Sequence, residues 1–240
     1  MVSTALFLWL WEVLVRYYKV PATLLPAPSM LFDRFLQTYP TIFAQAIPTT
    51  IETLLGFVLA TILGMLLAIA LTYSRLLDAA LYPGVIFFQL IPKIALAPLF
   101  IVWLGIGTES RLAFSMFIAF FPIVVATMAG LRSTPPEMLR LCDALTATKW
   151  QIFTLVRLPY AIPHIFSGMK IAVTFAMIGV IIGEFITAQR GLGFIIIFAS
   201  SQADTALILV AIAMLCVVGL GLYGVVALAE RVVARAYGSA

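Results

Sequence analysis

Charged side chains are scarce in this chain of 240 residues, because Lys, Arg, Asp and Glu together make up only 10% of it. Soluble domains carry about 25% charged and about 45–50% apolar residues. Here 64% of the residues are hydrophobic. The composition therefore excludes an ordinary soluble domain and indicates an integral membrane protein.

Residues that carry catalysis or bind metals are also few. The two cysteines, Cys142 in a predicted cytoplasmic loop and Cys216 within a predicted span, suggest no disulfide. A lone histidine, His164, has no companion ligands and argues against a metal site. No G-x-x-x-x-G-K-[ST] phosphate loop occurs, so an ATP site would have to lie on another polypeptide. We predict that the chain is not itself an enzyme and binds no cofactor.

Long apolar runs predict an all-α membrane fold with about six transmembrane helices. Three runs without charge each cover a hydrocarbon core of about 30 Å: Thr53–Ser74, Leu112–Leu131 and Thr205–Ala229. Three further spans are interrupted by charges or prolines: Met1–Tyr18, Leu81–Leu104 and Ile171–Gln189. The first could instead be a signal peptide, but it lacks a preceding basic residue and a clean cleavage site.

The distribution of basic residues predicts the orientation, because Lys and Arg in short loops stay cytoplasmic. They collect between Arg132 and Lys170, whereas the connection Gly105–Arg111 has one arginine opposite one glutamate. We therefore predict that the long loop and both termini are cytoplasmic. Lys19 and Arg34 would then lie outside, against the rule.

The stretch Pro21–Gln45 is rich in proline and then amphipathic. It predicts a short helix in the outer membrane interface. A loop packed on the helix bundle fits the same pattern.

The least hydrophobic stretch, Thr134–Lys170, separates two predicted spans. Thr134 and Glu137 have the spacing of a capping box, and Pro135 would occupy the first helical position, so a helix is predicted to start here. Its apolar residues recur at i, i+3, i+4 and i+7 and share one face: Met138, Leu141, Cys142 and Leu145.

A second short helical segment, Lys149–Leu158, places Trp150 and Phe153 at helical spacing. Pro159 and Pro163 are predicted to end this pattern. The pattern alone allows two interpretations: a surface on which a partner docks, and a basic amphipathic element that lies on the membrane.

This loop resembles the EAA loop of ABC importer permeases, whose form is roughly E-A-A-x-x-x-G-A, then L-P, then another proline and a glycine. The matching residues are Ala147, Trp150, Phe153, Leu158, Pro159, Pro163 and Gly168. Other segments resemble permeases of the nitrate, taurine and alkanesulfonate branch: IPKIALAPLFIVWLGIG at Ile91–Gly107, FFPIVVATMAGL at Phe120–Leu131 and GEFITAQRGLGFIII at Gly183–Ile197. The resemblance covers Ile47–Glu230.

The loop departs from the family motif at two positions. Arg140 replaces the acidic residue that opens the motif, and Thr146 replaces its glycine. Glycine permits a turn with positive φ, which a β-branched threonine resists. We expect either a different turn or a partner surface that has changed to suit.

The resemblance implies a type I ABC importer permease fold whose cytoplasmic coupling helix sits in a groove of an ATPase subunit. The implied partners are two cytoplasmic ATP-binding subunits that hold ATP and magnesium, an extracytoplasmic solute-binding protein and a second copy of this chain in the plasma membrane. The implied coupling residues are Glu137, Leu141, Cys142, Leu145, Thr146, Ala147, Trp150, Phe153, Leu158, Pro159, Pro163 and Gly168.

The predicted organisation has three parts. Residues 1–46 form the first helix and the outer amphipathic segment. Residues 47–230 form the permease core, with helices near 51–74, 81–104, 112–131, 171–189 and 205–229 and the coupling loop at 132–170. Residues 231–240 form a cytoplasmic tail.

Three residues are candidates for the translocation path. Glu184 is an ionisable group within an apolar span, where charges usually face a protein or water-filled interior. Alternatively, it lies at an interfacial helix end beside Arg190. Gln89 and Lys93 lie within the span Leu81–Leu104, where carbonyls freed by Pro92 and Pro98 could face a cavity. Lys93 could instead reach a lipid headgroup.

The cargo is open between two classes. The branch as a whole handles small oxyanions and sulfonates. The segment Ser200–Thr205, SSQADT, follows a GLGF sequence and resembles permeases for vitamin-type heterocycles, such as riboflavin or thiamine pyrimidine precursors. Alternative functions are a secondary transporter, for which we find no internal repeat, and a membrane-embedded enzyme or assembly protein.

Overall fold

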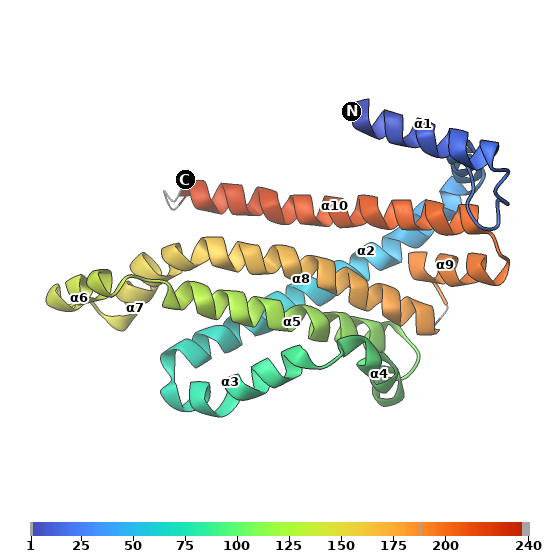
Figure 1. The fold of residues 1–240 in the computed structure, drawn as a ribbon. Helices are drawn as coiled ribbons and strands as arrows, with labels where there is room; N and C mark the ends of the chain where they lie inside the picture. Colours follow the sequence, from blue (N-terminus) through green and yellow to red (C-terminus); the bar gives the residue numbers. More distant parts are fainter. Residues whose placement is uncertain (1, 188, 237–240) are drawn as a thin grey trace. The chain divides into compact units, whose positions relative to one another are not determined.

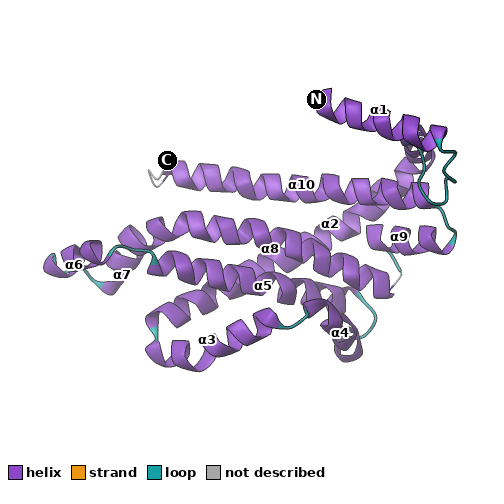
Figure 2. Cartoon of the chain, viewed as in Figure 1, coloured by secondary structure: helices purple, strands orange, loops and turns teal. Residues whose placement is uncertain are grey.

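The computed structural model describes residues 2–187 and 189–236, which form helices and the loops that join them (Figures 1 and 2). The long helices are α2 (Pro28–Tyr73), α5 (Thr108–Arg132), α8 (Leu158–Thr187) and α10 (Thr205–Ala236). The shorter helices are α1 (Val2–Tyr17), α3 (Arg75–Leu90), α4 (Ala97–Leu104), α6 (Pro136–Ala144), α7 (Lys149–Ile152) and α9 (Leu192–Ser201). The predicted all-α fold is confirmed. The last residues of the predicted tail, 237–240, lie outside the described part.

By length and hydropathy, four helices of the described chain can cross a membrane. The pair Arg75–Leu90 and Lys93–Leu104, which is bent by 94°, has the geometry of either a broken fifth span or a re-entrant loop. The break falls at Ile91 and Pro92, within the span that the sequence predicted to be interrupted. The first predicted span corresponds to α1, whose 16 residues are fewer than the about 20 that a bilayer core requires.

The predicted interfacial helix before Gln45 is not a separate element. Residues Pro28–Tyr73 form one helix of 46 residues that contains Pro40 and Pro48. A proline removes one backbone donor and bends a helix, but neighbouring groups in a membrane bundle can satisfy the freed carbonyl. The boundary predicted at residue 46 therefore falls inside a helix.

The contacts divide the chain into two compact units. Unit 1 consists of the residues up to Ile51 together with Ile181–Val218, and unit 2 consists of Glu52–Val180 together with the residues from Gly219 onward. In unit 1, a core of aliphatic side chains joins three helices: Ile42 and Ala46 of α2, Leu192 and Ile195 of α9, and Leu207 and Ala211 of α10.

In unit 2, small residues let α2 approach α5 closely. A Cβ atom placed on Gly56 would lie 2.3 Å from Ser115 Oγ, and one placed on Gly64 would lie 2.9 Å from Ile123 Cγ2. Small residues at this spacing are typical of close helix contacts in membranes. Together α2, α5 and α8 form the frame from which α6 and α7 project (Figure 1).

Candidate functional site

The helix of the coupling loop, α6, begins one residue later than predicted. Helix α6 starts at Pro136, and Pro135 is its N-cap with extended backbone (φ −58°, ψ 137°). A residue that precedes proline is disfavoured in the helical region, so Pro136 keeps Pro135 outside the helix. The predicted capping box at Thr134 is therefore wrong, and the buried Thr134 hydroxyl has no hydrogen-bond partner among the described residues.

Helix α6 ends in a turn that needs a left-handed residue, a position usually taken by glycine and here taken by Thr146. Thr146 has φ +53°, in the left-handed region. Its amide donates to the Asp143 carbonyl (3.0 Å), and the Ala147 amide donates to the Cys142 carbonyl (3.0 Å). These two bonds form a Schellman motif. The turn that the family's glycine permits is thus kept, and the expectation of a different turn is wrong.

Helix α7 starts with a capping box that the sequence analysis missed. The Gln151 amide donates to Thr148 Oγ1 (3.3 Å), and the Thr148 amide donates to Gln151 Oε1 (2.8 Å). The signal was present in the sequence, because Thr148 and Gln151 have the T-x-x-Q spacing of this motif.

The sequence pattern predicted that Pro159 and Pro163 end the helix, but the helix continues past both prolines. Residues Lys149–Thr187 are continuous, with a π-helical turn at Phe153–Arg157. The wide turn lies directly before Pro159, which has no amide hydrogen to donate. Pro163 and Gly168 then fall inside α8, and a Cβ on Gly168 would lie 2.4 Å from Ala126 Cβ of α5. Gly168 is therefore a packing residue between α8 and α5, whereas Pro163 is exposed.

Several large apolar side chains of the loop are open to the surroundings. The exposed fractions are 53% for Leu141, 70% for Leu145, 71% for Trp150 and 72% for Leu155. Half-buried residues of the predicted coupling set are Cys142, Ala147, Phe153, Leu158 and Pro159, whereas Glu137 is exposed. Met138, of the predicted apolar face, is also half-buried. The loop thus presents an apolar surface on α6 and α7, which we call the loop surface: Leu141, Leu145 and Trp150.

Aromatic contacts connect this loop to the end of α2. Phe153 packs edge-on against Tyr73, with 5.9 Å between ring centroids, and Trp150 packs against Phe153 at 5.8 Å. The Arg157 guanidinium lies over the Tyr73 ring at 5.2 Å. An arginine over an aromatic face gains about 0.5–2 kcal/mol. Sequence reasoning missed Tyr73, which lies 80 positions before Phe153 in the chain.

Two of the three predicted path residues lie at the break after α3. The Lys93 ammonium donates to the Gln89 backbone carbonyl (2.8 Å) and lies 5.5 Å from the centre of the Phe121 ring. Lysine near a helix C-terminus can satisfy a freed carbonyl in this way. The Gln89 side chain is exposed and Lys93 is half-buried. Lining of the path by these residues stays a prediction.

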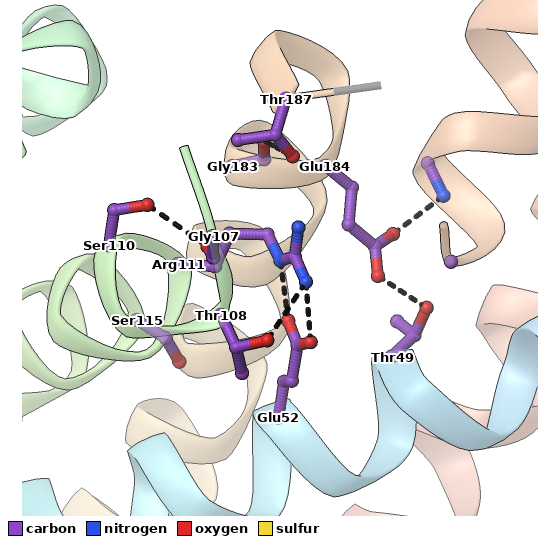
Figure 3. A network of polar contacts seen from close by, with 12 residues as sticks. Thr49, Glu52, Gly107, Thr108, Ser110, Arg111, Ser115, Gly183, Glu184 and Thr187 are labelled. Carbon is purple, nitrogen blue, oxygen red and sulfur yellow. Dashed lines mark hydrogen bonds and ion pairs between the residues drawn. The ribbon is translucent and has the colours of Figure 1, made fainter. Parts of the chain in front are cut away.

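The third, Glu184, is 1% exposed. Thr49 Oγ1 donates to Glu184 Oε1 (2.7 Å), as Figure 3 shows. The Gly193 amide donates to Glu184 Oε2 (2.7 Å). A buried carboxylate is tolerated when hydrogen bonds satisfy it. The structure therefore gives Glu184 partners within the protein.

Unit 2 contains a buried ion pair that the sequence analysis missed. Arg111 donates through two nitrogens to both carboxylate oxygens of Glu52, each at 2.7 Å, and both residues are 2% exposed (Figure 3). A bidentate pair of this kind is strong and directional. A signal existed, because the two charges stand directly before the charge-free runs Thr53–Ser74 and Leu112–Leu131.

Comparison with known proteins identifies the family. Residues 60–236 match the family described as "Binding-protein-dependent transport system inner membrane component". The riboflavin transport system permease protein RibX of Chloroflexus aurantiacus is 35% identical over 98% of this chain and 88% of its own length. The formylaminopyrimidine transport permease protein ThiX of Halalkalibacterium halodurans is 32% identical over 77% of this chain and 74% of its length. The taurine transport system permease protein TauC of Escherichia coli is 29% identical over 62% of this chain and 54% of its length.

The fold agrees with this assignment. A chain of the MetNI methionine ABC transporter, solved in inward-facing conformations, superposes with a TM-score of 0.68 at 19% identity, covering 82% of this chain and 96% of that one. The predicted resemblance to taurine and sulfonate permeases and to the vitamin-type subgroup is confirmed. The chain belongs to the family of binding-protein-dependent transport system inner membrane components and is a multi-pass membrane permease subunit of the ABC importer type.

Proposed function

We propose that the chain, as a homodimer, forms the membrane path of an ATP-driven importer. Two cytoplasmic ATPase subunits that hold ATP and magnesium dock on the α6–α7 loops, and an extracytoplasmic binding protein delivers the solute. In this proposal α1 is the first of six spans, so that both termini are cytoplasmic. The observation that carries this proposal is the loop surface, because a patch of exposed apolar side chains is typical of a protein interaction site.

The contacts of the loop suggest how motion reaches the membrane. Closure of the ATPase subunits on ATP displaces α6 and α7. The Schellman turn at Thr146 and the capping box at Thr148 make the joint between these helices short and defined. Phe153 and Arg157 then carry the displacement to Tyr73 and so to α2, because packed side chains move together.

For the cargo, we propose a small, flat heterocycle of the vitamin or vitamin-precursor type. The relatives named for riboflavin and formylaminopyrimidine match at 35% and 32% identity and over more of this chain than the one named for taurine. Sulfonates and other small oxyanions remain the competing class.

The Ser200–Thr205 segment, which suggested this class, joins α9 to α10. In it Ala203 has φ +54°. Asp204 accepts the Leu207 amide (3.0 Å) and pairs with Arg34. The segment therefore serves the fold directly, and its link to the cargo rests on the resemblance.

Affinity purification of the chain from its native membrane tests the docking role. We expect an ATPase subunit to copurify in about equal amount. Leu145→Asp should reduce its recovery by about tenfold, because a charge would be buried at the centre of an apolar contact. Leu24→Asp, at a leucine 72% exposed outside the loop, is the matched control. Purified chain without any ATPase, or equal recovery with both variants, would contradict the proposal.

A further inference from the structure

Helix α9 is too short to span a membrane and needs another anchor. Its 10 residues cover about half of a bilayer core. Leu192, Ile195 and Ala199 are buried in the core of unit 1, so the helix lies against protein along that face. The backbone amides at its buried start require partners, because an unsatisfied amide in an apolar setting is costly.

Those amides are bound by side chains from two other helices. The amides of residues 191–193, taken in order, donate to Gln45 Oε1 (2.7 Å), Thr49 Oγ1 (2.9 Å) and Glu184 Oε2 (2.7 Å). Gln45 and Thr49 are one turn apart on α2, and Glu184 is on α8. Three consecutive amides are thus held without a capping side chain from α9 itself.

The carboxylate lies where a helix attracts negative charge. The first turn of a helix carries a partial positive charge, which stabilises an anion there. Glu184 Oε2 accepts an amide of this turn, and Oε1 accepts the Thr49 hydroxyl (2.7 Å). The same hydroxyl accepts the Leu192 amide, so Thr49 and Glu184 form one connected network.

The turn before α9 leaves no room for a larger residue. Gly191 has φ +102°, a conformation that favours glycine, and a Cβ atom there would lie 1.9 Å from Glu184 Oε1. A Cβ atom on Gly193 would lie 2.8 Å from Glu184 Cβ and 3.0 Å from the Ile181 carbonyl oxygen. Both glycines therefore allow the backbone to close around the carboxylate.

We propose that Glu184 is a positioning residue: with Thr49, it binds the start of α9 and keeps that helix docked in unit 1 during the transport cycle. The N-terminal anion site of α9 is filled by the protein's own carboxylate. Glu184 acts on transport through α9 and does not touch the cargo. The part of this inference that concerns transport rests on the proposed function.

Hydrogen exchange of the purified chain, measured on peptides covering residues 189–200, tests the anchor directly. Thr49→Val and Glu184→Gln should each speed exchange of the amides at 191–193 by about tenfold or more, because local opening becomes easier. Thr50→Val is the matched control, since the Thr50 hydroxyl donates only within its own helix, to the Ala46 carbonyl. Thr49→Ser keeps the hydroxyl and should exchange like the unaltered chain.

Two outcomes would overturn the proposal: unchanged exchange at 191–193 in Thr49→Val, and equal acceleration in Thr50→Val. Thr49→Val keeps the test available if Glu184→Gln does not fold. In transport assays, Thr49→Val should lower uptake at saturating solute while copurification of the ATPase is unchanged. If the unaltered chain neither binds an ATPase nor takes up solute, the proposed function fails, whereas the exchange result on Glu184 still stands.

Discussion

At the scale of single residues, Thr146 adopts the left-handed backbone conformation although threonine disfavours it and glycine favours it. A left-handed conformation costs an ordinary residue about 1–2 kcal/mol, yet the two bonds of the Schellman turn hold Thr146 at φ +53°. The turn sets the joint between α6 and α7. The position of α7 therefore constrains this residue more than its own propensity does.

Thr146→Gly is expected to stabilise the end of α6. It removes the left-handed strain, partly offset by the greater freedom of glycine in the unfolded chain, for a net gain of about 1 kcal/mol. Exchange of the Ala147 amide, which donates to the Cys142 carbonyl, should slow by about fivefold. Thr148→Gly, which removes the α7 cap, should instead speed exchange of the Ala147 amide. Faster exchange at Ala147 in Thr146→Gly would show that the threonine is not strained.

At the scale of elements, the buried pair Glu52–Arg111 joins α2 to α5 in unit 2. Loss of one partner leaves a buried charge without its counter-ion and costs about 3–5 kcal/mol. Glu52→Gln should lower the free energy of unfolding by this amount in a reversible unfolding assay in detergent. Glu109→Gln, at an exposed glutamate in the first turn of α5, should change it little.

The exchanged pair, Glu52→Arg with Arg111→Glu, is the internal check on this prediction. It restores opposite charges between the same helices and should recover part of the lost stability. Equal stability of Glu52→Gln and Glu109→Gln would mean that the ion pair contributes nothing to the contact between α2 and α5.

The sequence predicted elements better than their ends and contacts. Long apolar runs identify the spans because burial in lipid depends on composition alone. Helix starts depend on single residues. Pro136 prevents a capping box at Thr134, whereas the equivalent capping box forms at Thr148. The Glu184–Thr49 bond was not predictable, because it joins positions 135 residues apart. The residues of the loop surface and of the turn at Thr146 are close in the sequence, so local patterns could pick them out, and their coupling role stays a prediction.

At the scale of the whole molecule, the orientation is a proposal that the ion pairs support. Arg34 and Arg111 fall on the predicted outer side, whereas the positive-inside rule expects basic residues on the cytoplasmic side. Each is paired: Arg34 Nη2 lies 2.5 Å from Asp204, and Arg111 lies 2.7 Å from Glu52. A basic residue whose charge is neutralised by a neighbour acts less strongly as an orienting charge.

The central claim is that ATP hydrolysis on a partner drives solute through this permease by way of the coupling loop. The most direct measurement is uptake of labelled riboflavin, formylaminopyrimidine and taurine, offered in parallel, into vesicles that contain the chain with its copurified ATPase and binding protein. We expect uptake of one solute class only in vesicles supplied with ATP, and a loss of that uptake in Leu145→Asp with insertion intact. Uptake that proceeds equally without ATP, or that is unaffected by Leu145→Asp, would contradict the account.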